Sequence, residues 1–183
     1  MPTWAWILIA IGAAIVIGAI AWSTYRKRRS LQLQDTFGAE YDRTVADAPT
    51  RREAEADLAE REKRHQEFEL KPLDPQARER YVERWRQTQE QFVDDPEGAV
   101  GQADGLIQEV MRERGYPVEN FEQRSADISV DHPRVVENYR EGHRLAGKSE
   151  GNGASTEDLR HAMRHYRALF EELVERPAEQ SAA

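Results

Sequence analysis

The chain has 183 residues, 33% of them charged, with a formal net charge of −8 and no cysteine. The lack of cysteine excludes disulfides, thiolate catalysis and cysteine-ligated metal sites. The four cationic residues at positions 26–29 contribute +4, so the rest of the chain carries −12. A domain with this negative charge should repel nucleic acid and anionic headgroups. The length of the chain allows one modest domain beside an N-terminal apolar segment.

That apolar segment consists of nineteen uncharged residues, Trp4 to Trp22. As a helix with about 1.5 Å rise per residue it spans about 28 Å, close to the hydrocarbon thickness of a bilayer. Four basic residues follow it and none precedes it: Arg26, Lys27, Arg28 and Arg29. The positive-inside rule therefore predicts one transmembrane helix over residues 4–25 of the inner membrane, with residues 1–3 outside and the later residues in the cytoplasm. We expect the basic cluster to contact anionic lipid headgroups, at about 1 kcal/mol per residue.

A cleaved signal peptide is the alternative interpretation of this segment, because Ala19-Ile20-Ala21 resembles a cleavage site. Signal peptides carry their positive charge before an apolar core of about 7–15 residues. Here the charge follows a longer core, which favours an uncleaved anchor. In the alternative, the protein is released into the cell envelope.

Small residues recur at every fourth position of the predicted span, at Ala10, Ala14 and Gly18. Such a stripe lets two transmembrane helices approach closely, which makes a homodimer through this helix one hypothesis. The alternative is an alanine-rich span without self-association.

Residues 26–71 are predicted to form a basic juxtamembrane segment and a charged helical stalk. Apolar residues recur every four positions and indicate a helix that continues from the span until Pro49: Leu33, Phe37, Tyr41 and Val45. A second helix over residues 50–69 begins at Thr50, with Glu53 at capping-box spacing. Its charged composition predicts a mostly solvated helix, or one that lies along a single partner helix.

Residues 72–176 are predicted to form a small helical bundle, and residues 177–183 a disordered tail. Asp74-Pro75 and Asp95-Pro96 each start a helix, since an N-cap carboxylate and a first-turn proline favour helix entry. Gly115 ends the second of these helices, and Trp85 on the first is expected at the core. No run alternates apolar and polar residues as a strand requires, so the predicted fold class is all-α.

The later part of the bundle is predicted as a short element, a helix, a loop and a last helix. The short element lies near residues 118–128, and Asp131-His132-Pro133 opens the next helix. Glycines across residues 142–154 indicate a flexible loop. Ser155 with Asp158 caps the last helix.

Asp131 and His132 form the most unusual polar patch, since Asp131 can orient His132 as a general base. The alternative is helix capping with an exposed histidine. His161 and His165 share a helix face, but neighbouring arginines disfavour a cation there, so we expect no metal site and no cofactor.

Residues Gly142 to Ser149 match the pattern GxxxxGK[ST] of phosphate-binding loops. That loop requires a buried strand before it and a helix after it, whereas here a polar helix precedes it and Glu150-Gly151-Asn152-Gly153 follows. We therefore expect a loop without phosphate binding.

Five stretches of the chain resemble a group of uncharacterised bacterial single-pass membrane proteins with an N-terminal anchor: FGAEYDRTV at 37–45, ERYVERW at 79–85, QFVDDP at 91–96, RGYP at 114–117 and VDHPRVV at 130–136. The resemblance covers most of residues 31–176. It implies a membrane anchor and brings no catalytic assignment, because the group has no established activity.

These patterns together predict a membrane-tethered, non-catalytic interaction or scaffold domain. Its expected partners are membrane lipid and a protein, and tethering would raise its effective concentration toward that protein. The alternative functions are a small-ligand binder or enzyme that uses Asp131 and His132, and the released envelope protein.

Overall fold

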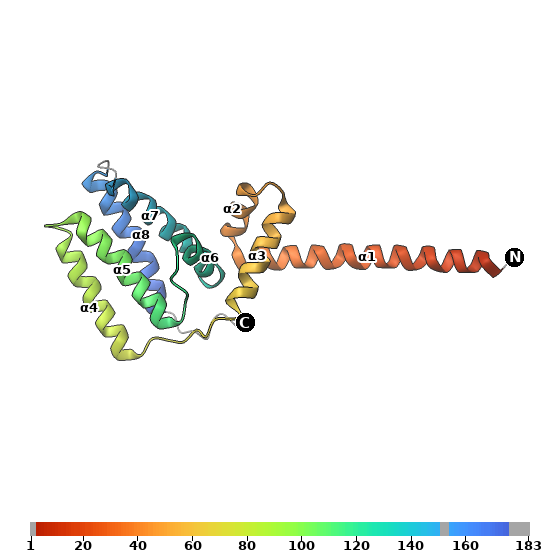
Figure 1. Cartoon of the computed structure of the whole chain (residues 1–183), viewed down its shortest axis with the longest axis horizontal. Helices are drawn as coiled ribbons and strands as arrows, with labels where there is room; N and C mark the ends of the chain where they lie inside the picture. The colour runs from red at the N-terminus through yellow and green to blue at the C-terminus, as the bar shows by residue number, and fades with distance from the viewer. Residues whose placement is uncertain (1–2, 151–153, 176–183) are drawn as a thin grey trace.

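The computed structural model describes the backbone of residues 3–150 and 154–175, and the side chains of residues 12, 14–147 and 154–175. This part of the chain forms eight helices and no strand, which confirms the all-α fold class (Figure 1): α1 (Thr3–Phe37), α2 (Ala39–Asp47), α3 (Arg51–His65), α4 (Pro75–Gln91), α5 (Pro96–Arg114), α6 (Phe121–Asp131), α7 (Val136–Glu150) and α8 (Thr156–Glu175).

Helix α1 is 35 residues long and projects away from a body made by the other seven helices (Figure 1). At about 1.5 Å per residue it measures about 52 Å. Every side chain from Ala14 to Arg28 is exposed, whereas Leu33 and Phe37 near its other end are buried. Of the described side chains of this helix, those in its last turns contact the body.

Among the described residues, no helix combines the length and the apolar character needed to cross a membrane. Of the predicted span at residues 4–25, the side chains of residues 4–11 and 13 lie outside the described residues.

Gly38 separates α1 from α2, which is the first departure from the predicted continuous helix. Its φ of 50° and ψ of −123° interrupt the helix there. The predicted apolar face is retained across the break and packs against α3, forming a small core of its own: Leu33, Phe37, Tyr41 and Leu58. Helix α3 begins at the predicted cap, since the Thr50 hydroxyl accepts a hydrogen bond from the Glu53 amide at 3.2 Å. Helices α1, α2 and α3 thus form one packed unit.

The main core lies among α4, α5, α7 and α8, with α5 and α7 both packed on α8. Trp85 of α4 is 5% exposed and stacks on Phe170 of α8, with ring centroids 4.6 Å apart, which confirms its predicted place at the core. The predicted caps are also present. Asp74 accepts from the Gln76 amide at 2.9 Å, and Asp95 accepts from the Gly98 amide at 3.0 Å.

Residues 142–150 are helical, so the predicted loop over residues 142–154 is wrong at its start, while residues 151–153 lie outside the described residues. Helix α7 continues to Glu150, and α8 follows from Thr156. A Cβ on Gly142 would lie 2.8 Å from Cδ1 of Tyr166, so this glycine allows α7 and α8 to approach closely. Packing against α8 thus outweighs the helix cost of glycine, about 1 kcal/mol.

Asp131 also differs from prediction, because it ends α6 and does not open the following helix. The His132 amide donates to the Ile128 carbonyl at 2.8 Å, and α7 begins only at Val136. Residues 132–135 turn the chain between the two helices.

Gly115 ends α5 as predicted, with a left-handed φ of 96°. The extended segment before α4 passes close to it: a Cβ on Gly115 would lie 2.5 Å from the Glu69 carbonyl oxygen. We expect Gly115→Ala to lower the free energy of unfolding by about 1–3 kcal/mol, because alanine is strained there and displaces this segment. The measurement is urea unfolding of the full chain in detergent.

Gly101→Ala in the same helix is the matched control. No heavy atom lies within 4 Å of the place its Cβ would take, so alanine should stabilise α5 by about 0.5–1 kcal/mol. Equal effects of the two substitutions would contradict this role of Gly115.

Candidate functional site

One face of α3 carries polar contacts to α2 and to α6. Arg61, Arg64 and His65 are spaced three and four residues apart, which places them on the same side of the helix. Each contacts a carboxylate from another helix. We call these three residues and their carboxylate partners Glu40, Asp127 and Asp131 the polar junction.

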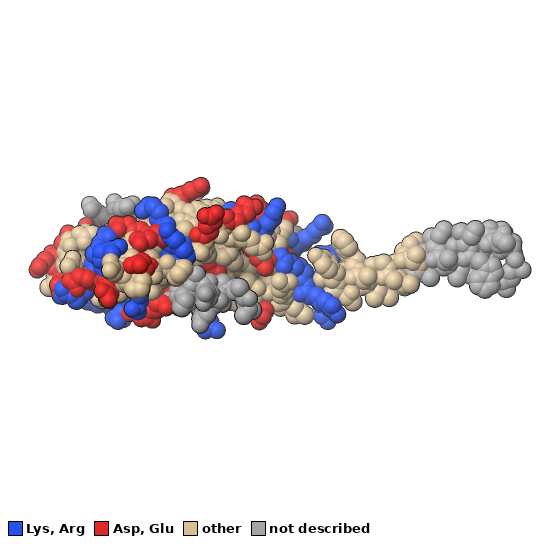
Figure 2. Space-filling view, turned by 90° about the horizontal axis from the view of Figure 1, so that it is seen from below, with Lys and Arg blue, Asp and Glu red and all other residues tan. Residues whose placement is uncertain are grey.

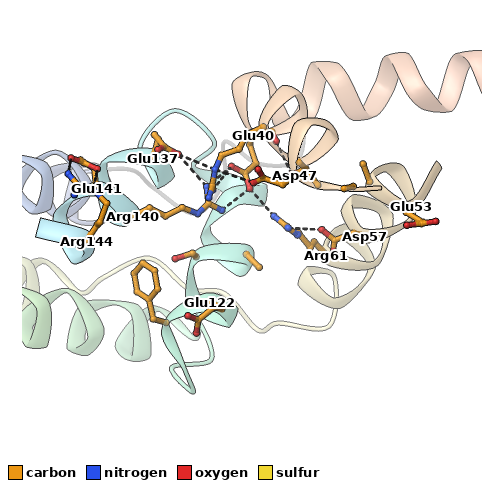
Figure 3. Close-up of a pocket in the computed structure, with 17 residues that line it drawn as sticks. Glu40, Asp47, Glu53, Asp57, Arg61, Glu122, Glu137, Arg140, Glu141 and Arg144 are labelled. Atoms are coloured by element: carbon orange, nitrogen blue, oxygen red, sulfur yellow. Dashed lines mark hydrogen bonds and ion pairs between the residues drawn. The ribbon is translucent and has the colours of Figure 1, made fainter. Parts of the chain in front are cut away.

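Glu40 is a buried carboxylate of the polar junction that pairs with two arginines. Its side chain is 2% exposed and accepts two hydrogen bonds from Arg140 of α7, at 2.5 and 2.7 Å, and one from Arg61 at 2.9 Å (Figure 3). Burial raises the pKa of Glu40, but the hydrogen bonds and charges of Arg140 and Arg61 outweigh it, so the net pKa is lowered. One carboxylate therefore fastens α2, α3 and α7 together.

A hollow of about 730 Å³ lies beside Glu40, between the α2–α3 pair and helices α6 and α7 (Figure 3). Both acidic and basic side chains line it, among them Asp57, Arg61 and Arg144. These charges largely pair with one another; Arg61, for example, also donates to Asp57 at 2.6 Å. Most charged side chains that line the hollow are therefore already paired within the protein.

Arg64 and Asp127 make the second contact of the polar junction. Asp127 of α6 is fully buried and accepts two hydrogen bonds from Arg64, at 2.8 and 3.0 Å. Gln123 donates to the same oxygen at 2.9 Å. This carboxylate is a packing element between α3 and α6.

Asp131 and His132, the predicted polar site, lie together in the third contact. Asp131 Oδ2 accepts from Tyr116 Oη and lies 2.6 Å from Nε2 of His65. His132 is 2% exposed, which excludes the alternative of an exposed histidine. Its Nδ1 lies 3.2 Å from Glu172, and its Nε2 lies 3.4 Å from Tyr116 Oη.

A second hollow, of about 910 Å³, is lined by both Asp131 and His132. For base catalysis, a ring nitrogen of His132 must reach a substrate proton. Both nitrogens instead face protein groups, Glu172 and Tyr116. These side chains thus form one polar network that connects α3, α6 and α8.

His132 should make the fold sensitive to mild acid. Burial lowers its pKa below the ordinary 6.5, against the opposing effects of Glu172 and Asp131. Below pH 6.5 the unfolded chain binds a proton that the folded chain does not, so stability contributed by neutral His132 falls as the pH drops through that value. We expect the Tm to decrease between pH 7.5 and 5.5, and His132→Gln to reduce that decrease.

His161→Gln is the control for this pH dependence, because His161 is 48% exposed and its partner Glu157, on the same helix, is 55% exposed. It should keep the wild-type pH dependence. The same decrease in Tm for wild type, His132→Gln and His161→Gln would contradict the assignment to His132.

The structure places the other predicted site residues apart from this junction. Arg26, Lys27 and Arg28 are exposed on α1, and Arg29 pairs with Glu62 at 2.5 Å. Of the small-residue stripe, Ala14 and Gly18 are exposed, and the Ala10 side chain lies outside the described residues.

Two sequence motifs remain, the histidine pair and the GxxxxGK[ST] residues. His165 contacts Asn138 at 2.8 Å, and no group of three potential metal ligands occurs within the described part of the chain. The GxxxxGK[ST] residues lie within α7, where helical hydrogen bonding occupies backbone amides that a phosphate-binding loop would present.

Sequence reasoning missed Glu40, Arg61, Arg64 and Arg140. Their sequence signal is only local, because Asp57 and Glu60 stand four residues before Arg61 and Arg64. The Asp57–Arg61 pair is present, whereas Arg64 contacts Asp127.

Comparisons with protein-family models, with curated proteins and with solved structures find no match to this chain. The bacterial group named from the sequence therefore stays a prediction.

Proposed function

We propose that this protein is a membrane-tethered helical interaction domain without catalytic activity, held at the cytoplasmic face of the inner membrane. Helix α1 would anchor it, with residues 1–3 outside. The body would then meet partner proteins at the membrane surface, where tethering raises its effective concentration.

One observation carries this proposal: the large apolar side chains of α1 between Ile15 and Trp22 are exposed and are not covered by the body. Ile15, Val16, Ile17, Ile20 and Trp22 are 57–67% exposed. They point to different sides of the helix, since successive helical residues are about 100° apart. Burying such a side chain gains about 1.5–3 kcal/mol, and a bilayer around the helix would bury all five of them.

The packed connection between α1 and the body supports a role in which the anchor fixes the orientation of the body at the membrane. Leu33 and Phe37 are 1% and 0% exposed, so the helix that would cross the bilayer ends inside the small core. A body attached in this way is held at a defined angle to its anchor and does not hang from a flexible linker.

Alkaline carbonate extraction tests the anchor. We expect full-length protein to stay in the membrane pellet and a variant lacking residues 1–25 to be washed off. Release of the full-length chain, or a mature mass that lacks residues 1–21, would contradict the tether and favour the released envelope protein.

Affinity purification from detergent-solubilised membranes tests the interaction role. We expect a protein partner that is recovered with the full-length chain and is absent with residues 1–31 alone, which carry the anchor without the body. The same set of proteins in both samples would contradict the role of the body.

A small-ligand binder is the second candidate function. The observation that favours it is the placement of buried His132 and Asp131 beside the same 910 Å³ hollow. It predicts a small molecule that native mass spectrometry detects on the purified protein and that Asp131→Asn removes. The internal partners of both side chains favour the interaction domain.

A further inference from the structure

We propose that Arg51 and Arg52, at the start of α3, form with Arg26 and Lys27 a binding site for the headgroup of an anionic phospholipid. The site presupposes the proposed membrane tether and extends it, because α3 then also contacts lipid. Sequence reasoning limited lipid contact to residues 26–29.

The fold brings the start of α3 back to α1, although the two segments are more than twenty residues apart in sequence. Arg51 Nη2 donates to Ser30 Oγ of α1 at 2.7 Å. The Arg51 guanidinium also lies over the ring of Tyr41, 5.7 Å from its centroid. Figure 2 shows basic side chains gathered where α1 leaves the body.

A hollow of about 630 Å³ lies between the two segments. Its lining holds four cations, one anion, two hydroxyl groups and an apolar side chain: Arg26, Lys27, Arg51, Arg52, Glu55, Ser30, Thr50 and Leu31. The one anion, Glu55, already accepts from Arg51 at 2.9 Å and from Tyr41 at 2.8 Å. The hollow thus keeps a net positive charge.

Three of the four cations in this hollow have no acidic partner among the described residues, whereas Arg51 pairs with Glu55. Arg26, Lys27 and Arg52 make no ion pair with any residue of the described ranges, whereas Arg61 and Arg140 both pair with Glu40. Because these cations converge on one hollow that holds a single carboxylate, an anion from outside the protein can neutralise the remaining positive charge.

The depth of the hollow fits a headgroup. Arg26, in the lining of the hollow, follows Trp22 by four residues, about 6 Å along the helix, and tryptophan prefers the membrane interface. The negative surface potential of an anionic membrane extends about one Debye length, or about 8–10 Å. Exposed Leu31 offers an apolar contact beside the cations, and the positive end of the α3 dipole lies at the same place.

The ligand is therefore a phosphate group in a lipid headgroup. Free phosphate has the same charge and hydrogen-bond acceptors. The proposed tether, however, holds the hollow beside a membrane, where anionic headgroups are densely packed.

Native mass spectrometry of the full-length protein in neutral detergent tests the site, with titration by phosphatidylglycerol. Arg51→Gln/Arg52→Gln should weaken binding about 30-fold, since each cation near the surface contributes about a factor of five. Phosphatidylcholine should bind weakly to both proteins, and millimolar inorganic phosphate should not compete. Competition by inorganic phosphate would assign the hollow to a free anion and overturn the lipid.

Arg80→Gln/Arg112→Gln is the matched control, because it removes two exposed cations from α4 and α5, outside the hollow. It should leave affinity unchanged, and equal weakening by both double variants would overturn the site. If Arg51→Gln/Arg52→Gln fails to fold, Arg52→Gln alone should weaken binding about five-fold.

Carbonate extraction separates this site from the tether. The Arg51→Gln/Arg52→Gln protein should remain in the pellet, because α1 is unchanged. Wild-type protein washed from membranes would instead contradict the tether itself.

Discussion

Glu40→Ala is expected to lower the free energy of unfolding by about 3–5 kcal/mol. The substitution leaves Arg61 and Arg140, which are only 16% and 14% exposed, without their shared carboxylate. Among the described residues, Arg61 keeps only the half-exposed Asp57 as an ion-pair partner, and Arg140 only the exposed Glu137. Neither largely buried guanidinium can recover full hydration, so the loss is costly. Urea unfolding in detergent measures the change.

Glu83→Ala is the control for this effect. Glu83 also accepts two hydrogen bonds from one arginine, Arg86, but both side chains are more than half exposed. An exposed pair is worth about 0–1 kcal/mol, so little stability should be lost. A loss for Glu40→Ala no larger than for Glu83→Ala would show that the polar junction is not what holds α2, α3 and α7 together.

Phe37→Ala is expected to destabilise the fold by about 3–5 kcal/mol. Phe37 is fully buried at the end of α1, in the small core with Leu33, Tyr41 and Leu58. Truncation leaves a cavity where the anchor helix meets the body. Hydrogen exchange should therefore report faster opening of α2 and α3 than of α5 and α8, whose core is separate.

Leu31→Ala tests whether burial is the cause. Leu31 lies on the same helix but is 55% exposed, so its truncation should change the free energy of unfolding by no more than about 0.5 kcal/mol. Uniform faster exchange across all helices in Phe37→Ala would contradict a separate small core.

Local chemistry made most of the helix boundaries predictable. The carboxylates of Asp74 and Asp95 cap the helices that follow them, and Gly115 takes the left-handed conformation that ends α5. Each of these signals acts within four residues, so it can be read without knowing the fold.

Predictions failed where the fold decides between local alternatives. Gly142 looked like part of a loop, but it is the helical position that lets Tyr166 approach. Asp131 looked like a cap, but its partners are His65 and Tyr116, brought to it by α3 and the turn after α5.

The polar junction could not be predicted, because its pairs join residues far apart in sequence. Arg64 had an acidic neighbour at i,i+4 spacing, yet it contacts Asp127, 63 residues later. Sequence spacing reveals only pairs within a helix, and in a chain that is 33% charged it cannot identify which carboxylate will be buried.

Single-cysteine labelling of the full chain in its membrane tests the tether most directly, since the natural sequence has no cysteine to interfere. Ile17 and Val93 are 67% and 81% exposed in the isolated molecule, so only a bilayer should make the labelling rates of cysteines at these two positions differ. We expect a membrane-impermeant maleimide to label Thr3→Cys in intact cells, Val93→Cys only in inside-out vesicles, and Ile17→Cys only after detergent. Labelling of Ile17→Cys in intact membranes as fast as Val93→Cys in inside-out vesicles would contradict a membrane-spanning α1.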